Sequence, residues 1–443
     1  MSLVSDSLVP AAPTEGYYDL GAYSRPISSE SDAAKVWFNR GLIWSYAFNH
    51  AEAYRCFEQA IVHDRNCAIA YWGLAYAAGP NYNKAWGLFD PVDLKRSMKT
   101  CHDAARHAQK LLRTSSATPV ERALIGAMQA RFPVGHRVED FSALDQAYAQ
   151  AMKKVYDQFG TDDLDVVALY ADARMHTSQR KMFHVKTGVP IESSPVYEVQ
   201  RLFEAGLRHP DGEKHPGLIH FSIHFWEMSA TPAVALPSAV ALPSADRLRH
   251  LVPDAGHIHH MPTHLDVLVG DYRRSVDSNM AAVQADEKYL AREGPILPLT
   301  QLPFAGSKVA LRMIDRMELS ITDDVLLVQS PPLADWLEFF MSLRIHVYVR
   351  FGQWEELKAL PVPHDQDLYC VTTAMTHYGK GIAWAATCDV MEAERERELY
   401  QAAAERVPPT RKDYPNLIID VLKVATTMLE GEIEYRRGNS LPI

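Results

Sequence analysis

The chain lacks the features that assign a protein to several common classes. Its 443 residues contain no apolar run of bilayer-spanning length, and residues 1–15 lack the charged and apolar regions of a signal peptide. It has no Gly-x-Gly-x-x-Gly after a strand, no phosphate-binding loop and no Gly-x-Ser-x-Gly elbow. We therefore expect a cytoplasmic protein with neither a membrane partner nor a nucleotide cofactor.

The chain also has few cysteines, and its acidic residues outnumber its basic ones. The five cysteines are an odd number and none forms a Cys-x-x-Cys pair, so we expect buried, reduced thiols in a reducing compartment: Cys56, Cys67, Cys101, Cys370 and Cys388. The net charge of −10 comes without any strongly basic face. A nucleic-acid partner is therefore not expected.

Alternation of β-branched and polar residues is almost absent, which argues against sheets. Residues 36–78 instead carry small and large apolar residues at helical spacing, including Ala53, Phe57 and Ala60. Small residues let neighbouring helices approach closely, and the aromatic ring fills the space between them. This spacing matches a tetratricopeptide (TPR) unit, and Gly79-Pro80 would end its third helix.

Weaker copies of the pattern follow along the chain. Residues 268–290 repeat the Gly-x-Tyr turn, the helix of small residues and the terminal aspartate, and further echoes lie at 350–360, 379–404 and 428–438. We therefore predict an all-α protein, an α-solenoid of TPR-like helix-turn-helix repeats. The predicted organisation is a flexible lead-in with few contacts (1–30) and a single superhelical array (31–443), which contains the clearest repeat (36–78), histidine-rich central repeats (209–290) and C-terminal repeats (346–443).

Histidine is abundant and unevenly distributed: the chain has 19, nine of them lie between residues 209 and 264, and two stretches there matter most. In the first stretch, HPGLIHFSIHFWE, Pro216 can begin a helix with His215 near its cap. His220 and His224 then lie four residues apart on one face, with Glu227 three residues further on. That spacing lets both imidazoles bind one cation.

The second stretch, HIHHMPTHL, has His260 and His264 four residues apart, with His257 three residues before His260. Pro262 interrupts it, so we expect a helix to begin near Met261 with His260 at its entrance. An isolated histidine on an apolar face is more often a packing residue, but two paired elements separated by one connection favour a metal site. The predicted ligands are His220, His224, His260 and His264, with His257 or His215 as alternatives to His260.

Neutral imidazoles with few carboxylates suit Fe, Cu or Zn better than Mg or Ca. We favour Fe or Cu and leave Zn open, with Glu227 and His257 as the expected catalytic residues. Glu227 would serve as a general base if the metal is zinc. The absence of His-Glu-x-x-His argues against a standard metalloprotease.

The two stretches resemble the motifs HPGxxHxxIHxxE and AGHxxHMPxH of a group of TPR-domain proteins. The resemblance extends to GPNYN (79–83), VRFGQWEEL (349–357) and MTHYGKGIAWAA (375–386), and it covers most of residues 36–438. It implies a helical repeat fold with a metal-like centre, carried over to His215, His220, His224, Glu227, His257, His260 and His264. His50 and His377 also match histidine positions of the group. The chain departs from the group at 302–311, where LPFAGSKVAL replaces a run of the HNxHF type.

Aromatic residues surround the histidines in the sequence and suggest a pocket for a hydrophobic or aromatic small molecule. The expected pocket residues are His50, Asn81, Tyr82, Asn83, Trp86, Trp226 and His377. The function that we expect is a metal-dependent oxidoreductase or oxygenase, with a zinc-type hydrolase or lyase as the alternative. A non-catalytic TPR scaffold that binds a peptide is the alternative of another class, with Asn81, Asn83 and Lys84 either as its carboxylate clamp or as helix caps. A scaffold does not need paired histidines, so we favour the enzyme.

Overall fold

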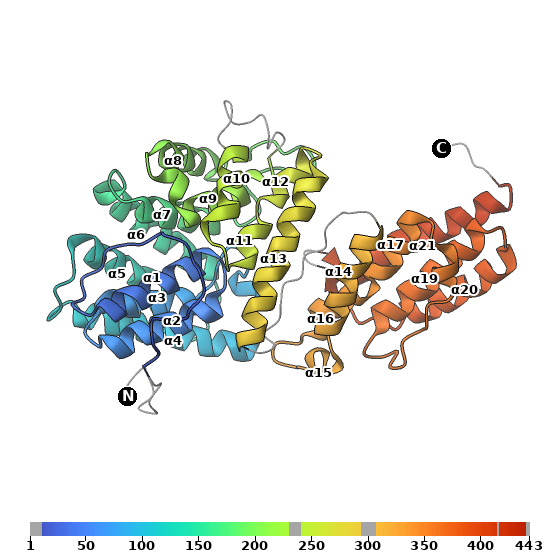
Figure 1. Ribbon diagram of the computed structural model, residues 1–443, viewed down its shortest axis with the longest axis horizontal. Helices are drawn as coiled ribbons and strands as arrows, with labels where there is room; N and C mark the ends of the chain where they lie inside the picture. Colours follow the sequence, from blue (N-terminus) through green and yellow to red (C-terminus); the bar gives the residue numbers. More distant parts are fainter. Residues whose placement is uncertain (1–10, 230–240, 294–306, 414–415, 440–443) are drawn as a thin grey trace. The chain divides into compact units, whose positions relative to one another are not determined.

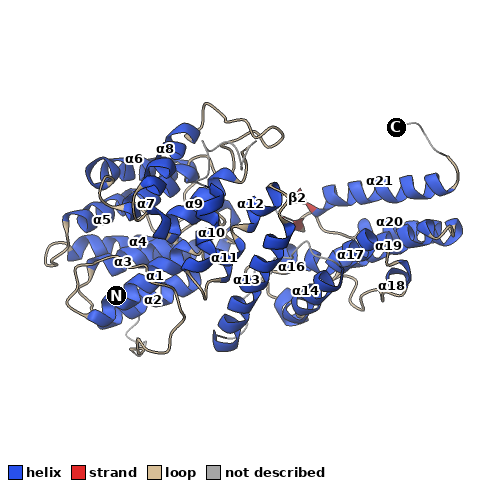
Figure 2. Cartoon of the chain, turned by 45° about the horizontal axis from the view of Figure 1, so that its top comes forward, coloured by secondary structure: helices blue, strands red, loops and turns tan. Residues whose placement is uncertain are grey.

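The computed structural model describes residues 11–229, 241–293, 307–413 and 416–439, and nearly all regular structure among them is helical (Figures 1 and 2). The all-α prediction is therefore confirmed. The described strands are two residues long each, β1 (Lys412–Asp413) and β2 (Asn416–Leu417), and they pair antiparallel. The sequence predicts one array over 31–443, whereas the contacts divide the chain into two compact units, residues 1–301 and 302–443.

The first unit consists of helices joined mostly by short turns. They are α1 (Asp32–Tyr46), α2 (His50–His63), α3 (Ala68–Ala78), α4 (Pro91–Leu111), α5 (Pro119–Arg131), α6 (Phe141–Phe159), α7 (Leu164–His176), α8 (Val196–Arg208), α9 (Pro216–Trp226), α10 (Ala241–Leu251), α11 (Gly256–His260), α12 (Thr263–Leu268) and α13 (Tyr272–Glu293). Two short 3-10 helices lie among them, Trp86–Leu88 and Gly212–Lys214.

The second unit is built in the same way from α14 (Ser307–Ser320), α15 (Asp323–Leu326), α16 (Ala334–Leu337), a 3-10 helix (Glu338–Ser342), α17 (Leu343–Phe351), α18 (Trp354–Lys358), α19 (Cys370–Ala386), α20 (Val390–Ala404) and α21 (Ile418–Arg436). Its main core lies between α19, α20 and α21. None of the described helices of either unit combines the length and apolar character that crossing a bilayer requires.

The first three helices pack around one aromatic ring, as the repeat pattern predicts. Phe57 of α2 is fully buried. A β-carbon at Gly41 of α1 would lie 2.8 Å from this ring, and one at Gly73 of α3 would lie 2.3 Å from it. Only glycine leaves room for the ring at both positions, so the two glycines set the close approach of α1 and α3.

The segment before α1 makes more contacts than the sequence predicts. Tyr18 and Ile27 are buried, and Arg25 forms ion pairs with Asp163 and Asp165 of the α7 N-terminus at 2.7 and 2.6 Å. The expectation of a lead-in with few contacts is therefore wrong for residues 17–29, because apolar and charged side chains there complete the core and a buried ion-pair network. Residues 1–10 lie outside the described part of the chain.

The cysteines of the described residues are all free, and four of them are buried, as expected. Cys388 is the exception, because it lies exposed in the turn between α19 and α20 with φ of 66°.

Candidate metal centre

Helix α9 holds the first two histidines of the site, and its position is fixed at its first turn. Pro216 is its first residue, and His215 caps it by accepting a hydrogen bond from the Leu218 N–H at 3.0 Å. A β-carbon at Gly217 would lie 2.5 Å from the Tyr46 ring, so α9 packs closely against the end of α1. The predicted start of this helix is confirmed.

The two α9 histidines each donate their Nδ1 hydrogen to a fixed acceptor. His220 donates to the Tyr46 carbonyl at 2.5 Å, and His224 donates to the Glu227 carboxylate at 3.1 Å. Both side chains are buried. The Nε2 atom of each ring therefore keeps its lone pair. The Nε2 atom of His224 is buried and has no hydrogen-bond partner among the described residues.

The second half of the site comes from α11 and α12. Met261 and Pro262 separate these short helices, so His260 ends one helix rather than standing at the entrance of the next, as we had expected. His260 Nδ1 lies 2.9 Å from Asn279 Oδ1, whose amide nitrogen donates to the Ser275 carbonyl. His264 Nδ1 donates to the second Glu227 oxygen.

Four imidazoles therefore have their Nδ1 hydrogen engaged, and their Nε2 lone pairs remain for another partner. Two pairs of Nε2 atoms lie close together, His220 with His257 at 3.2 Å and His260 with His264 at 2.7 Å. In the second pair both rings donate through Nδ1, so in the neutral rings neither Nε2 has a hydrogen for the other. In metalloproteins, ligating histidines commonly donate their other ring hydrogen in this way, which fixes the ring and its tautomer.

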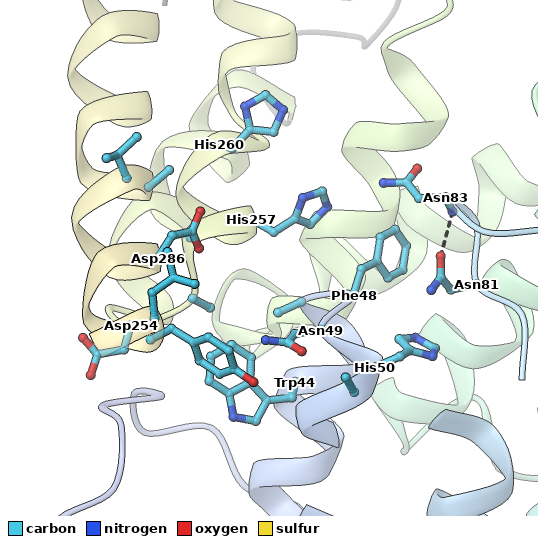
Figure 3. Close-up of a pocket in the computed structure, with 18 of the residues that line it drawn as sticks. Trp44, Phe48, Asn49, His50, Asn81, Asn83, Asp254, His257, His260 and Asp286 are labelled. Atoms are coloured by element: carbon cyan, nitrogen blue, oxygen red, sulfur yellow. Dashed lines mark hydrogen bonds between the residues drawn. The ribbon is translucent and has the colours of Figure 1, made fainter. Parts of the chain in front are cut away.

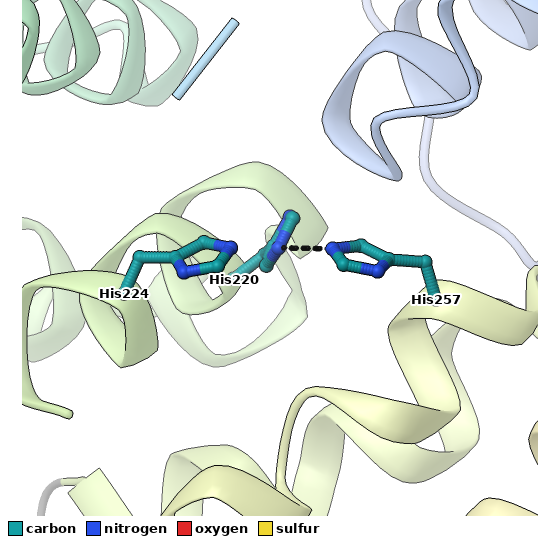
Figure 4. A group of neighbouring side chains, drawn as sticks. All are labelled: His220, His224 and His257. Carbon is teal, nitrogen blue, oxygen red and sulfur yellow. Dashed lines mark hydrogen bonds between the residues drawn. The ribbon is translucent and has the colours of Figure 1, made fainter. Parts of the chain in front are cut away.

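His220, His224 and His257 form the tightest group, with one nitrogen from each ring all within 4.8 Å of one another (Figure 4). Two Zn–N bonds of ~2.1 Å at a tetrahedral angle place their nitrogens ~3.4 Å apart. The 3.2 Å between the Nε2 atoms of His220 and His257 is close to that separation.

Burial keeps these imidazoles neutral. It lowers the pKa of His220, His257 and His260 well below the ordinary range, with a further contribution from neighbouring imidazoles, and it lowers the pKa of His224 as well. A neutral imidazole is the form that binds a metal ion.

The structure gives Glu227 a different environment from the one that a general base needs. Burial alone would raise its pKa, but His224 and His264 lower it well below the ordinary value, and Arg180 lies 3.6 Å away. Both carboxylate oxygens are engaged by imidazoles. The geometry therefore suits Glu227 to orienting two histidines rather than to accepting a proton.

The structure also changes the roles expected of His257 and His215. His257, expected as a catalytic residue, belongs to the tightest nitrogen group, where we had expected His260. His215, the other alternative ligand, is occupied by the cap of α9 and by Asp165, which lies 3.2 Å from its Nε2.

A cavity of about 410 Å³ adjoins the histidines and is lined by His257 and His260 (Figure 3). The predicted pocket residues His50, Asn81 and Asn83 also line it. Tyr82, Trp86 and Trp226 are buried in the surrounding core and are not among its lining residues.

His377 belongs to the second unit, on α19, where its ring bonds with Glu396 of α20 at 2.7 Å. It is not among the residues that line the cavity.

The alternative clamp of Asn81, Asn83 and Lys84 forms a turn instead. Asn81 Oδ1 accepts hydrogen bonds from the Asn83 and Lys84 N–H groups at 2.9 and 2.8 Å. Lys84 Nζ pairs with Asp93 at 2.6 Å. The charge that a clamp would offer to a peptide carboxylate is therefore already neutralised.

Phe48 is the site residue that the sequence analysis missed. Its ring centroid lies 4.5 Å from that of His220 and 5.4 Å from that of His224, in a stacked arrangement with the latter. Its φ of 56° is unusual for a bulky side chain. Nothing in the local sequence shows such a backbone conformation, which the packing of α1, α2 and α9 imposes.

Comparisons with known proteins identify no family. No family model matches the chain, and no curated protein matches it. Among solved structures the chain is similar to that of yeast Tom70, with 10% identity, 92% of this chain and 90% of that chain covered, and a TM-score of 0.27. A TM-score of this size carries no argument about function, so the description of the fold rests on the helices themselves. Residues 302–306, where the departure from the resembling group begins, lie outside the described part of the chain.

Proposed function

We propose that the histidine cluster binds one transition-metal ion and that the protein is a metal-dependent enzyme acting on a hydrophobic or aromatic small molecule. The observation that carries this proposal is the engaged Nδ1 hydrogen of four clustered imidazoles, which leaves their Nε2 atoms for a metal and sets those of His260 and His264 against each other. A purely structural cluster has no need to set lone pairs against each other.

The donor set fits such an ion. Neutral imidazoles suit Fe, Cu or Zn, and the one nearby carboxylate, Glu227, is occupied by two of the rings. When bound, the metal would supply either redox chemistry or Lewis-acid activation. We favour an oxidoreductase with Fe or Cu, because Glu227, which the sequence suggested as the base for hydrolysis, is committed to two imidazoles. A zinc hydrolase or lyase is the alternative.

The chain's own residues would prepare the reaction in two ways. Glu227, Asn279 and the Tyr46 carbonyl orient the rings, which reduces reorganisation on binding. Phe48 covers three of the imidazoles, since its ring centroid also lies 5.5 Å from that of His257. An apolar cover of this kind limits the access of water to the site.

Elemental analysis of the purified full chain tests the proposal. We expect a near-stoichiometric transition metal in the native protein and loss of most of it in His224→Ala. His259→Ala is the matched control, because His259 bonds the Pro253 carbonyl and stands apart from the cluster. Full metal content in His224→Ala, or none in the native protein, would contradict the proposal. Zinc as the native metal would favour the hydrolase or lyase.

A peptide-binding scaffold is the second candidate, and one observation favours it. Val424, Met428 and Tyr435 of α21 are 60%, 54% and 62% exposed and recur at helical spacing on one face. Single exposed apolar residues are ordinary, but a stripe of them can receive an amphipathic peptide. The scaffold would be favoured over the enzyme if the purified chain holds no metal, binds peptides on an array and loses this binding in Met428→Asp.

A further inference from the structure

Asp286 of α13 is an uncompensated carboxyl group on the wall of the cavity. It has no hydrogen bond or ion pair to any other described residue. A β-carbon at Gly256 would lie 2.1 Å from Asp286 Oδ1, so the carboxyl group fills the space beside the residue that precedes His257. Burial raises the pKa of Asp286 to about 7. The side chain is half-buried. A carboxyl group that is partly removed from water without a partner is costly, and a cationic ligand would reduce that cost.

The other charged groups that line the cavity are neutralised within the protein. Lys84 pairs with Asp93 at 2.6 Å. Asp254 accepts a hydrogen bond from the Asp19 N–H at 2.6 Å and pairs with Lys288 at 2.5 Å. The charge that the cavity can offer to a ligand is therefore the negative charge of Asp286.

His50 adds no positive charge to the wall of the cavity. Its Nδ1 donates to the Ala77 carbonyl at 3.0 Å, and its Nε2 is buried with no partner among the described residues. Burial lowers the pKa of His50 to about 4, so the ring is neutral and Nε2 carries a lone pair. Figure 3 shows Asp286 and His50 on opposite sides of the labelled residues, with Phe48 and Asn49 between them.

Aromatic rings form the apolar part of the wall. Trp44 and Tyr289 line the cavity with Phe48, and the ring centroids of Trp44 and Tyr289 lie 5.8 Å apart in an edge-to-face arrangement. Aromatic faces attract organic cations as well as apolar groups. The wall therefore suits a ligand that joins a cationic group to an apolar body.

We propose that the cavity binds an organic ammonium ion, with the cationic nitrogen on Asp286 and its apolar body against Trp44, Phe48 and Tyr289. The inference deepens the proposed function by naming the class of substrate. It rests on that function for the chemistry, but the binding itself requires no metal.

Calorimetric titration of the chelator-treated full chain with two matched pairs of ligands tests the inference. The pairs are 2-phenylethylamine with 3-phenylpropionate, and hexylamine with hexanoate. We expect each amine to bind at least about tenfold more tightly than its acid, because only the amine can form a charge-assisted hydrogen bond with the Asp286 carboxylate. Asp286→Asn should abolish this preference. Asp277→Asn, which changes an exposed carboxylate of the same helix, should keep it.

Equal or weaker binding of the amines by the native chain would overturn the inference without recourse to any variant. A preference that persists in Asp286→Asn would overturn it as well. Thermal unfolding of Asp286→Asn checks that the fold is intact, and its metal content should equal that of the native protein. If the purified protein holds no metal but binds the amines, this inference stands while the proposed function fails. If it holds a metal but does not prefer the amines, the proposed function stands while this inference fails.

Discussion

The two halves of the histidine cluster are positioned by different means. Helix α9 carries His220 and His224 one turn apart on an unbroken helix, so backbone geometry alone sets their separation. The histidines of α11 and α12 lie on two short helices around Pro262. Their rings are held by outer hydrogen bonds, from His260 to Asn279 and from His264 to Glu227. The first half therefore depends on how α9 is anchored, and the second depends on the partners of its rings.

The largest effect is expected from the anchor of α9. Asp165 accepts hydrogen bonds from Tyr23 and Tyr46, pairs with Arg25 at 2.6 Å and lies 3.2 Å from His215, the cap of α9. Asp165→Asn leaves Arg25 buried with a single carboxylate partner. We expect a loss of about 3 kcal/mol in the free energy of unfolding, measured by denaturant titration.

The same variant should change the response to acid. Burial raises the pKa of Asp165, but Arg25 and the hydrogen bonds from His215 and Tyr23 outweigh burial and hold the pKa well below the ordinary range. Its contribution to stability is therefore present above the unfolded pKa of ~3.9 and is lost as the pH falls further. Asp165→Asn should lose this part of the acid dependence. Asp162→Asn changes an exposed neighbour and should retain the acid dependence of the native protein. Equal stability of the two variants would show that Asp165 does not anchor α9.

A smaller effect is expected where the two halves meet. Among the described residues, Glu227 alone accepts hydrogen bonds from both halves, through His224 and His264. Glu227→Gln keeps the size of the side chain but retains a single acceptor oxygen. We expect metal affinity to fall by about 10- to 100-fold, measured by competition with a chelator. Unchanged affinity would show that the rings need no common carboxylate.

The smallest effect is expected from the break itself. Pro262 has φ of −56° and ψ of −27°, which alanine adopts without strain. Pro262→Ala should therefore change stability by less than about 1 kcal/mol and metal affinity by no more than a few-fold. If affinity instead falls as far as in Glu227→Gln, the proline rather than the outer hydrogen bonds positions the second half.

Sequence reasoning reached furthest where the contacts are local. The start of α9 at Pro216 with His215 as its cap follows from neighbouring residues, and so does the packing of Phe57 between small residues. Sequence reasoning was less accurate where the role of a side chain depends on residues that are distant along the chain. Glu227 is assigned a basic role by its spacing, yet its environment depends on His264, 37 residues away. The repeat pattern ends the helix of residues 268–290 at an aspartate, yet Asp286 lies within α13 on the wall of the cavity.

The sequence by itself determined the helical character of the chain, the cap of α9 and the shared face of His220 and His224, because these follow from periodicity and from hydrogen bonds within a few residues. Only the tertiary structure decided that His257 joins that pair, that Phe48 covers it and that residues 17–29 belong to the core. The reason is the distance along the chain over which the deciding contacts form. The hydrogen bond that fixes the ring of His220, for example, joins it to a carbonyl 174 residues away. No local pattern encodes such a contact, since it exists only once α1 and α9 have packed.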